Sequence, residues 1–122
     1  MHIGREHLPQ LVTLAAGWVS RLHESLHADG QPLPDLFHRA FSPFFTAEML
    51  ARVRVHVVDE IPNPDFYPQL HEQGLDLPLD FRQMAGLTLI DTVLVSRSRA
   101  DLSTLALAPL LFHECVHVAQ CP

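Results

Sequence analysis

The first third of the chain carries a stripe of apolar residues that predicts one long helix over residues 7–28. The apolar positions recur every three or four residues with polar residues between them, as on one face of an amphipathic helix. They are Leu8, Leu11, Val12, Ala15, Val19, Leu22 and Leu26. Asp29 and Gly30, with prolines close behind them, predict the end of this helix.

Three shorter helices are predicted in the next part of the chain. Pro34 is a typical entry residue for a helix over Asp35–Phe41. Thr46 is a typical N-cap for a second helix that runs through Ala51. A third helix is predicted over about residues 65–73, where Gly74 would end it.

Three runs of apolar and β-branched residues predict a small sheet. Residues 53–59 alternate and are rich in valine, which favours a strand. Residues 86–90 and 93–96 are two further runs of this kind, and Asp91 and Thr92 between them predict a two-residue hairpin turn.

The last part of the chain, residues 102–121, is its most apolar stretch and predicts a C-terminal helix. Asp101 or Ser103 is the expected start, and Pro109 predicts either a kink or a later start. Because apolar residues occupy all sides of this helix, we expect it to be buried all round.

This C-terminal stretch contains His113-Glu114-Cys115-Val116-His117. Residues four apart lie nearly one above the other on a helix, so both imidazoles can bind one metal ion. Glu114 borders the same face and could act as general base toward a water. The pattern predicts a Zn²⁺ site with His113 and His117 as metal ligands and Glu114 as the catalytic residue.

The same five-residue pattern occurs a second time, at His23-Glu24-Ser25-Leu26-His27. This copy has charged neighbours and ends at a turn signal. We interpret it as the polar end of an amphipathic helix, where histidine suits the helix dipole. His23 and His27 are nevertheless a candidate secondary metal site.

Together the elements predict an α+β fold with a long N-terminal helix, a small sheet of about three strands with a hairpin, and a buried C-terminal helix that carries His-Glu-x-x-His. At 122 residues the chain is expected to be a single domain, residues 1–122. Residues 1–45 would form its helical N-terminal part, and residues 46–122 the core around the motif.

Composition and charge exclude several functional classes. The formal charge is −6 without a basic cluster, so nucleic acid and anionic membranes are not expected partners. The chain has no lysine, which excludes a Schiff-base lysine and a phosphate-loop lysine. A membrane span is not expected either, because Glu114 and two histidines would lie within the most apolar stretch.

Further features of the sequence bear on location and redox state. No signal peptide is evident at the N-terminus, and the richness in Arg, Ala and Leu is typical of a GC-rich bacterial genome, so a bacterial cytoplasmic location is expected. The two cysteines, Cys115 and Cys121, would point to different helix faces, so we expect no disulfide.

Several of these runs together resemble a known family. The segments at residues 53–56, 86–89 and 93–95, followed by residues 110–120, are similar to the compact bacterial zincin-like metallopeptidase domain, a family of unknown function. The likeness covers about residues 46–120. It implies a small sheet packed on the active-site helix, zinc on His113 and His117, Glu114 as general base, and a peptide or protein as substrate or partner.

The sequence departs from the zincin pattern at the third metal ligand. Catalytic zinc takes three protein ligands and a water, and zincins supply the third downstream of the second histidine, whereas this sequence ends at Pro122. Cys121 lies about 12 Å along a straight helix from His113 and would need a broken last turn. The upstream candidates are Glu60 and His56, ranked first, then His71, Glu72 and Asp91.

Three functions therefore compete. The first is a zinc metallopeptidase-like hydrolase. The second is a catalytically incomplete zincin-like domain that binds metal or a protein. Its third ligand would be absent, supplied by another chain of an oligomer, or lost with a truncated C-terminus. The third is a di-metal carboxylate protein that uses Glu24-x-x-His27 and Glu114-x-x-His117 on two helices.

Overall fold

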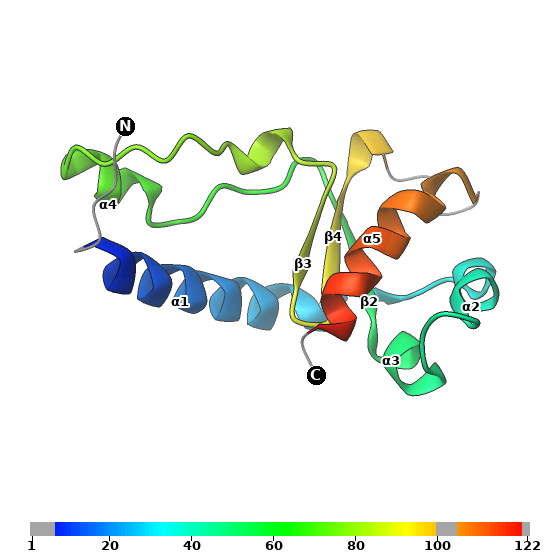
Figure 1. Cartoon of the computed structure of the whole chain (residues 1–122). Coiled ribbons are helices and arrows are strands. Elements are labelled where there is room, and N and C mark those ends of the chain that lie inside the picture. The colour runs from blue at the N-terminus through cyan, green and yellow to red at the C-terminus, as the bar shows by residue number, and fades with distance from the viewer. Residues whose placement is uncertain (1–6, 100–104, 121–122) are drawn as a thin grey trace.

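The computed structural model describes residues 7–99 and 105–120, and it has the predicted α+β architecture. Helices flank a central sheet of mixed strand direction (Figure 1). The helices are α1 (Leu8–Leu26), α2 (Asp35–Phe41), α3 (Ala47–Arg52), α4 (Tyr67–Glu72) and α5 (Ala108–Ala119). The strands are β1 (Gln31–Pro32), β2 (Arg54–Val58), β3 (Gly86–Leu89) and β4 (Thr92–Ser96).

The described part of the sheet has four strands in the order β1-β2-β4-β3, so the expectation of about three was wrong by one. The additional strand, β1, is two residues long and pairs antiparallel with β2. A pair of residues that includes a proline has no alternation to detect, so no sequence signal marks it. β2 and β4 pair in parallel, which makes β4 an inner strand and β3 the edge strand.

The β3–β4 hairpin turns one residue earlier than predicted. Leu89 pairs with Thr92, so the loop consists of Ile90 and Asp91 rather than Asp91 and Thr92. Ile90 has a positive φ of 61°. Two-residue hairpin loops usually place Gly, Asn or Asp at such a position, so a β-branched residue hid the turn from its sequence.

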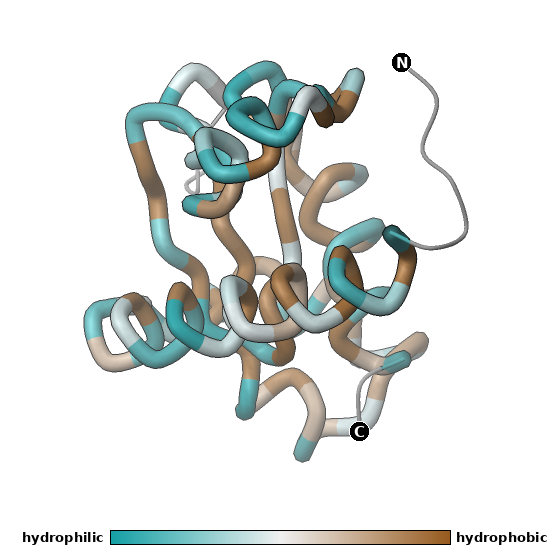
Figure 2. The backbone as a smooth tube through the Cα atoms, turned by 90° about the vertical axis from the view of Figure 1, so that its left-hand side faces the viewer, coloured by the Kyte–Doolittle hydropathy of each residue, from teal (hydrophilic) through white to brown (hydrophobic). Residues whose placement is uncertain are grey.

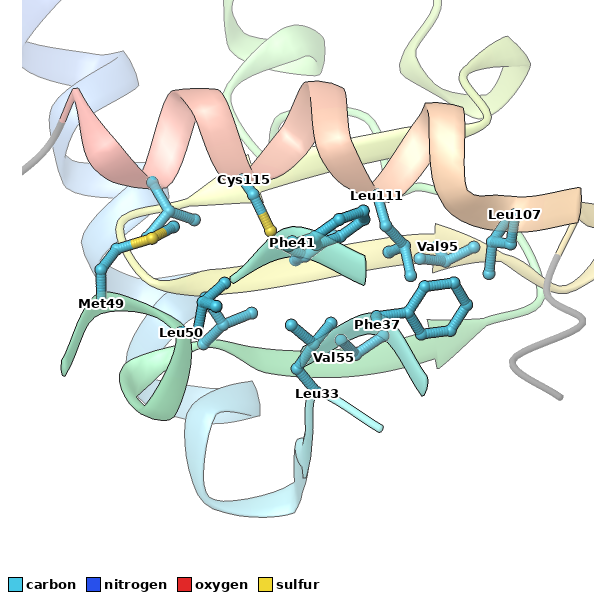
Figure 3. Packing of buried hydrophobic residues seen from close by; sticks show 13 residues of the cluster. Leu33, Phe37, Phe41, Met49, Leu50, Val55, Val95, Leu107, Leu111 and Cys115 are labelled. Carbon is cyan, nitrogen blue, oxygen red and sulfur yellow. The ribbon is translucent and has the colours of Figure 1, made fainter. Parts of the chain in front are cut away.

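One face of the sheet packs against α5, α2 and α3. Leu111 and Cys115 point from α5 toward Val55 and Val95 on the sheet, and Phe41 of α2 fills the space beside them (Figure 3). The residues of α2 belong to the same buried cluster as those of α5. Within the N-terminal part, α2 therefore contributes directly to the core around the motif.

The opposite face packs against α1 and the long segment between β2 and β3. Side chains alternate along β4, so Leu94 points away from α5 and contacts a cluster with Leu89, Ile61 and partly buried Leu22. Farther along α1, Trp18 is buried in a neighbouring cluster. Figure 2 shows this arrangement as hydrophobic strands crossing the interior, with hydrophilic segments at the outer turns.

The C-terminal helix α5 begins at Ala108 with Pro109 in its first turn, which confirms the later helix start that Pro109 predicted as the alternative to a kink. The alternative starting points, Asp101 and Ser103, lie outside the described residues. The expectation that this helix is buried all round is wrong. It lies across one face of the sheet, so that Glu114 is buried while His113 and His117 face solvent. No helix in the described ranges is long and apolar enough to cross a bilayer.

Candidate functional site

His113 and His117 converge on the solvent side of α5. Their Nε2 atoms are 3.3 Å apart and their ring centroids 4.8 Å apart. Two nitrogens bound to one tetrahedral zinc, at bond lengths of about 2.0–2.1 Å, lie about 3.3 Å from each other. Gln120 Oε1 lies 3.2 Å from His117 Nδ1, so an Nδ1–H can donate to it and leave Nε2 free for a metal. The donor pair therefore fits zinc in both distance and chemistry.

Glu114 lies beside this pair but is held in the protein interior. Its residue is 5% exposed. Thr88 Oγ1 on β3 lies 2.8 Å from the carboxylate Oε1 and 3.1 Å from the main-chain oxygen of Glu114, and donates its hydrogen to this pair of acceptors. The carboxylate is thus fixed on the sheet side of the two imidazoles.

Gly86 allows α5 to lie this close to β3. A Cβ at this position would come within 3.2 Å of Leu110 Cδ1, 3.3 Å of Leu94 O and 3.5 Å of Glu114 Cγ. Contacts of 3.2–3.3 Å are tight, and one of them is to backbone that cannot rotate away. The absence of a side chain at Gly86 therefore sets the spacing between the motif helix and the edge strand.

A cleft of about 460 Å³ runs along β3, at the edge of the sheet. The walls come from α1, β3, the hairpin turn and α5: Val19, Gly86, Leu87, Thr88, Ile90, His113, Glu114 and His117. An apolar groove of about 510 Å³, formed largely by α1 and residues 64–81, shares Val19, Leu87 and Thr88 with this cleft. The histidine pair and the carboxylate therefore open onto a continuous concave surface.

The structure does not bring the first-ranked candidates for a third ligand to this pair. His56 alternates with Val55 on β2, and Val55 faces the α5 side, so His56 lies on the opposite face of the sheet. Glu60 is exposed in the loop after β2. Cys121 lies outside the described residues. The third ligand of His113 and His117 stays a prediction.

The copy of the motif at residues 23–27 does acquire a carboxylate. Among residues 7–99 and 105–120, the one group of at least three His, Cys, Asp or Glu with ligand atoms within 4.8 Å of each other is His23, His27 and Asp91. Asp91 Oδ1 is 2.8 Å from His23 Nε2 and 3.4 Å from His27 Nδ1. Asp91 was a candidate ligand for the other histidine pair, and the hairpin turn brings it here instead.

Cys115, inside the copy of the motif at residues 113–117, takes no part in the cleft. Its side chain is fully buried, carries a free thiol, and points from α5 into the core (Figure 3). Burial, and secondarily the charge of Glu114, raise the pKa of this thiol to about 11. The group is therefore protonated at neutral pH, which makes it a packing residue.

Two residues of the site were not found by sequence reasoning. Thr88 and Gly86 lie in a short β run, where a threonine is common and a lone glycine carries no specific signal. Their importance comes from the helix that crosses them, which is remote in sequence.

No protein-family model matches the chain, and neither curated proteins nor solved structures give a significant match.

Proposed function

We propose that this protein is a zinc-dependent hydrolase that cleaves peptide bonds, with zinc held by His113 and His117. The observation that supports this most directly is the 3.3 Å separation of the two Nε2 atoms, next to a buried carboxylate and in the same cleft. A satisfied pair of core histidines would instead be buried, whereas His113 and His117 are exposed.

Zinc bound there would supply Lewis-acid polarisation of the scissile carbonyl. Glu114 would act as general base: its carboxylate takes a proton from the attacking water and delivers it to the leaving nitrogen. The Thr88 hydroxyl, at 2.8 Å, holds the carboxylate in one orientation for both transfers. Thr88 is thus a positioning residue in this mechanism.

The form of the cleft favours an extended peptide as substrate. β3 is an edge strand, so its outward main-chain groups can pair with an added strand. Successive side chains of such a strand would point alternately toward the histidine pair and toward the apolar groove beside Leu87. A groove with an almost wholly apolar lining favours a bulky hydrophobic side chain at that position.

The test compares Glu114→Gln with Glu24→Gln, the matching substitution in the other copy of the motif. Zinc content is measured by atomic absorption, and turnover with an unstructured protein and a fluorogenic peptide library. We expect Glu114→Gln to keep its zinc and lose hydrolysis by at least about 100-fold. Glu24→Gln should keep both. Turnover by Glu114→Gln at the wild-type rate would overturn the proposal.

A second candidate function is a zinc-binding module that recognises a partner without turnover. It is favoured by one observation: the part of the chain that the structure describes offers His113 and His117 no third His, Cys, Asp or Glu ligand. Stoichiometric zinc that a chelator removes, together with no peptide hydrolysis, would support this second function. The di-metal carboxylate alternative requires a helical bundle. The helices of the described residues pack on a central four-stranded sheet instead of forming such a bundle.

A further inference from the structure

His23, His27 and Asp91 come from two segments that are far apart in sequence, and they meet at one end of the sheet. His23 lies in the last turns of α1, and His27 in the short 3₁₀ helix that follows it. Asp91 lies in the β3–β4 turn. We propose that these three side chains form a second metal site, which binds one Zn²⁺ or a similar borderline divalent cation.

Two of the three distances between ligand atoms are close to those a tetrahedral ion needs, and all three atoms lie within 4.8 Å of one another. With metal bonds of about 2.0–2.2 Å, ligand atoms lie about 3.3–3.6 Å apart. Asp91 Oδ1 is already 3.4 Å from His27 Nδ1. Its 2.8 Å hydrogen bond to His23 Nε2 would have to lengthen by about half an ångström. Side-chain rotation alone can supply such a shift.

The three side chains are partly exposed, which leaves room for a metal to enter and for a water as fourth ligand. The side chains of His23, His27 and Asp91 are 22%, 42% and 16% exposed. The histidine rings are 4.8 Å apart and inclined by 35°. Two imidazoles with one carboxylate suit zinc and related ions, whereas calcium and magnesium prefer oxygen ligands alone.

The backbone around Asp91 shows a separate feature that is common at functional positions. Ile90, directly before it, has a φ of 61°, which is costly for a β-branched residue. This conformation closes the hairpin in two residues and turns Asp91 toward α1. Thr92 Oγ1 donates to Asp91 Oδ1 at 3.5 Å and so helps to orient this carboxylate. Its 3.1 Å contact with His27 Nδ1 would be given up when that nitrogen binds the metal.

A metal at this position would join the end of α1 to the hairpin turn. Ile90 of the same turn lines the cleft below His113 and His117. The second site would therefore hold one wall of the cleft in place, without contacting a substrate there. Metal binding here does not depend on hydrolysis, since it uses a different set of ligands.

The experiment titrates ZnCl₂ into the His113→Ala/His117→Ala double variant by calorimetry, so that the other histidine pair is absent. We expect one zinc per chain. Adding Asp91→Asn should weaken the affinity by at least about tenfold. The control is His71→Ala, because His71 also pairs with a carboxylate, Asp76, at 2.6 Å but belongs to no such group. This control should leave the affinity unchanged.

A measurement without the double variant guards against its misfolding. Asp91→Asn in the otherwise wild-type chain should lower the zinc content by one ion per chain and reduce the zinc-induced rise in Tm. Failure of the double variant to bind zinc while folded, or an unchanged affinity and zinc content in Asp91→Asn, would overturn the second site. Either result would leave the Glu114→Gln test of hydrolysis unaffected.

Discussion

The hydroxyl of Thr88 reaches across from the edge strand to the carboxylate of Glu114, 2.8 Å away, and joins β3 to the helix that carries the histidine pair. A carboxylate that is 5% exposed needs such a donor, because burial removes the water that would otherwise solvate it. The same bond serves stability and, in the proposed mechanism, orientation of the general base.

Replacing Thr88 by valine keeps the shape of the side chain and removes the donor. We expect Thr88→Val to lower the free energy of unfolding by about 1–3 kcal/mol, because Glu114 is left buried without its partner. Urea denaturation followed by circular dichroism measures this. The control is Thr13→Val, since Thr13 is exposed and donates only to the carbonyl of Pro9 within its own helix. A change below about 0.5 kcal/mol at both positions would show that the bond contributes nothing.

Two glycines should respond to alanine with opposite signs. At Gly86 a methyl group would press on Leu110 and on the carbonyl of Leu94, so we expect Gly86→Ala to destabilise the protein by about 1–3 kcal/mol. Gly17 lies inside α1, and a methyl group there meets only the mobile end of Arg21 at 3.0 Å. Gly17→Ala should therefore stabilise by up to about 1 kcal/mol.

Thermal unfolding of the two alanine variants, under identical conditions, checks the pair. If Gly86→Ala proved as stable as wild type, the close approach of α5 to β3 would not be a constraint. Zinc binding gives a second reading, because displacement of α5 at Gly86 should disturb the cleft while Gly17→Ala should not.

The Cys115 thiol predicts a pH dependence at the alkaline end. Burial raises its pKa from 9.0 to about 11. Because the folded pKa is the higher one, its contribution to stability is complete below pH 9 and is lost as the pH rises through 11. We expect the free energy of unfolding to fall in this window by up to about 1.4 kcal/mol per pH unit.

The measurement compares denaturation curves at several pH values for Cys115 and for Cys115→Ala, both in a Cys121→Ser background. The alanine variant should have a lower stability throughout, because a cavity replaces the sulfur. Its slope between pH 9 and 11 should be shallower than that of the parent. Parallel slopes would show that the thiol titrates equally in both states.

His56 offers a test of its exclusion from the metal centre. Its Nδ1 is buried and has no hydrogen-bond partner among the described residues. We expect His56→Val to raise stability by about 1 kcal/mol, since a strand-forming apolar residue replaces an unsatisfied polar atom. Zinc affinity at His113 and His117 should stay within twofold. A large loss of zinc would identify His56 as the missing ligand after all.

The elements that could be predicted are those with local signals. Thr46 accepts a hydrogen bond from Met49 N as the expected N-cap of α3, and Gly74 adopts a φ of 77° after α4. The convergence of His113 and His117 follows from their spacing of four on a helix. Each of these depends on residues within one or two turns of each other.

The features that could not be predicted depend on remote pairs. Asp91 and His23 are 68 positions apart, and nothing near either residue indicates the other. The parallel pairing of β2 with β4 is likewise a long-range choice, and β1 exists only because β2 offers it an edge. Burial on one side of α5 was misjudged because apolar residues on every side of a helix do not show which face the sheet will cover.

The position of β4 between β3 and β2 has a kinetic consequence. β3 and β4 are joined by two residues, so this hairpin can form within microseconds. Its pairing with β2 must wait until the chain between Val58 and Thr92 has closed into a loop, which is slower and entropically unfavourable. We therefore expect refolding to be limited by the docking of β2 onto the early-formed β3–β4 hairpin.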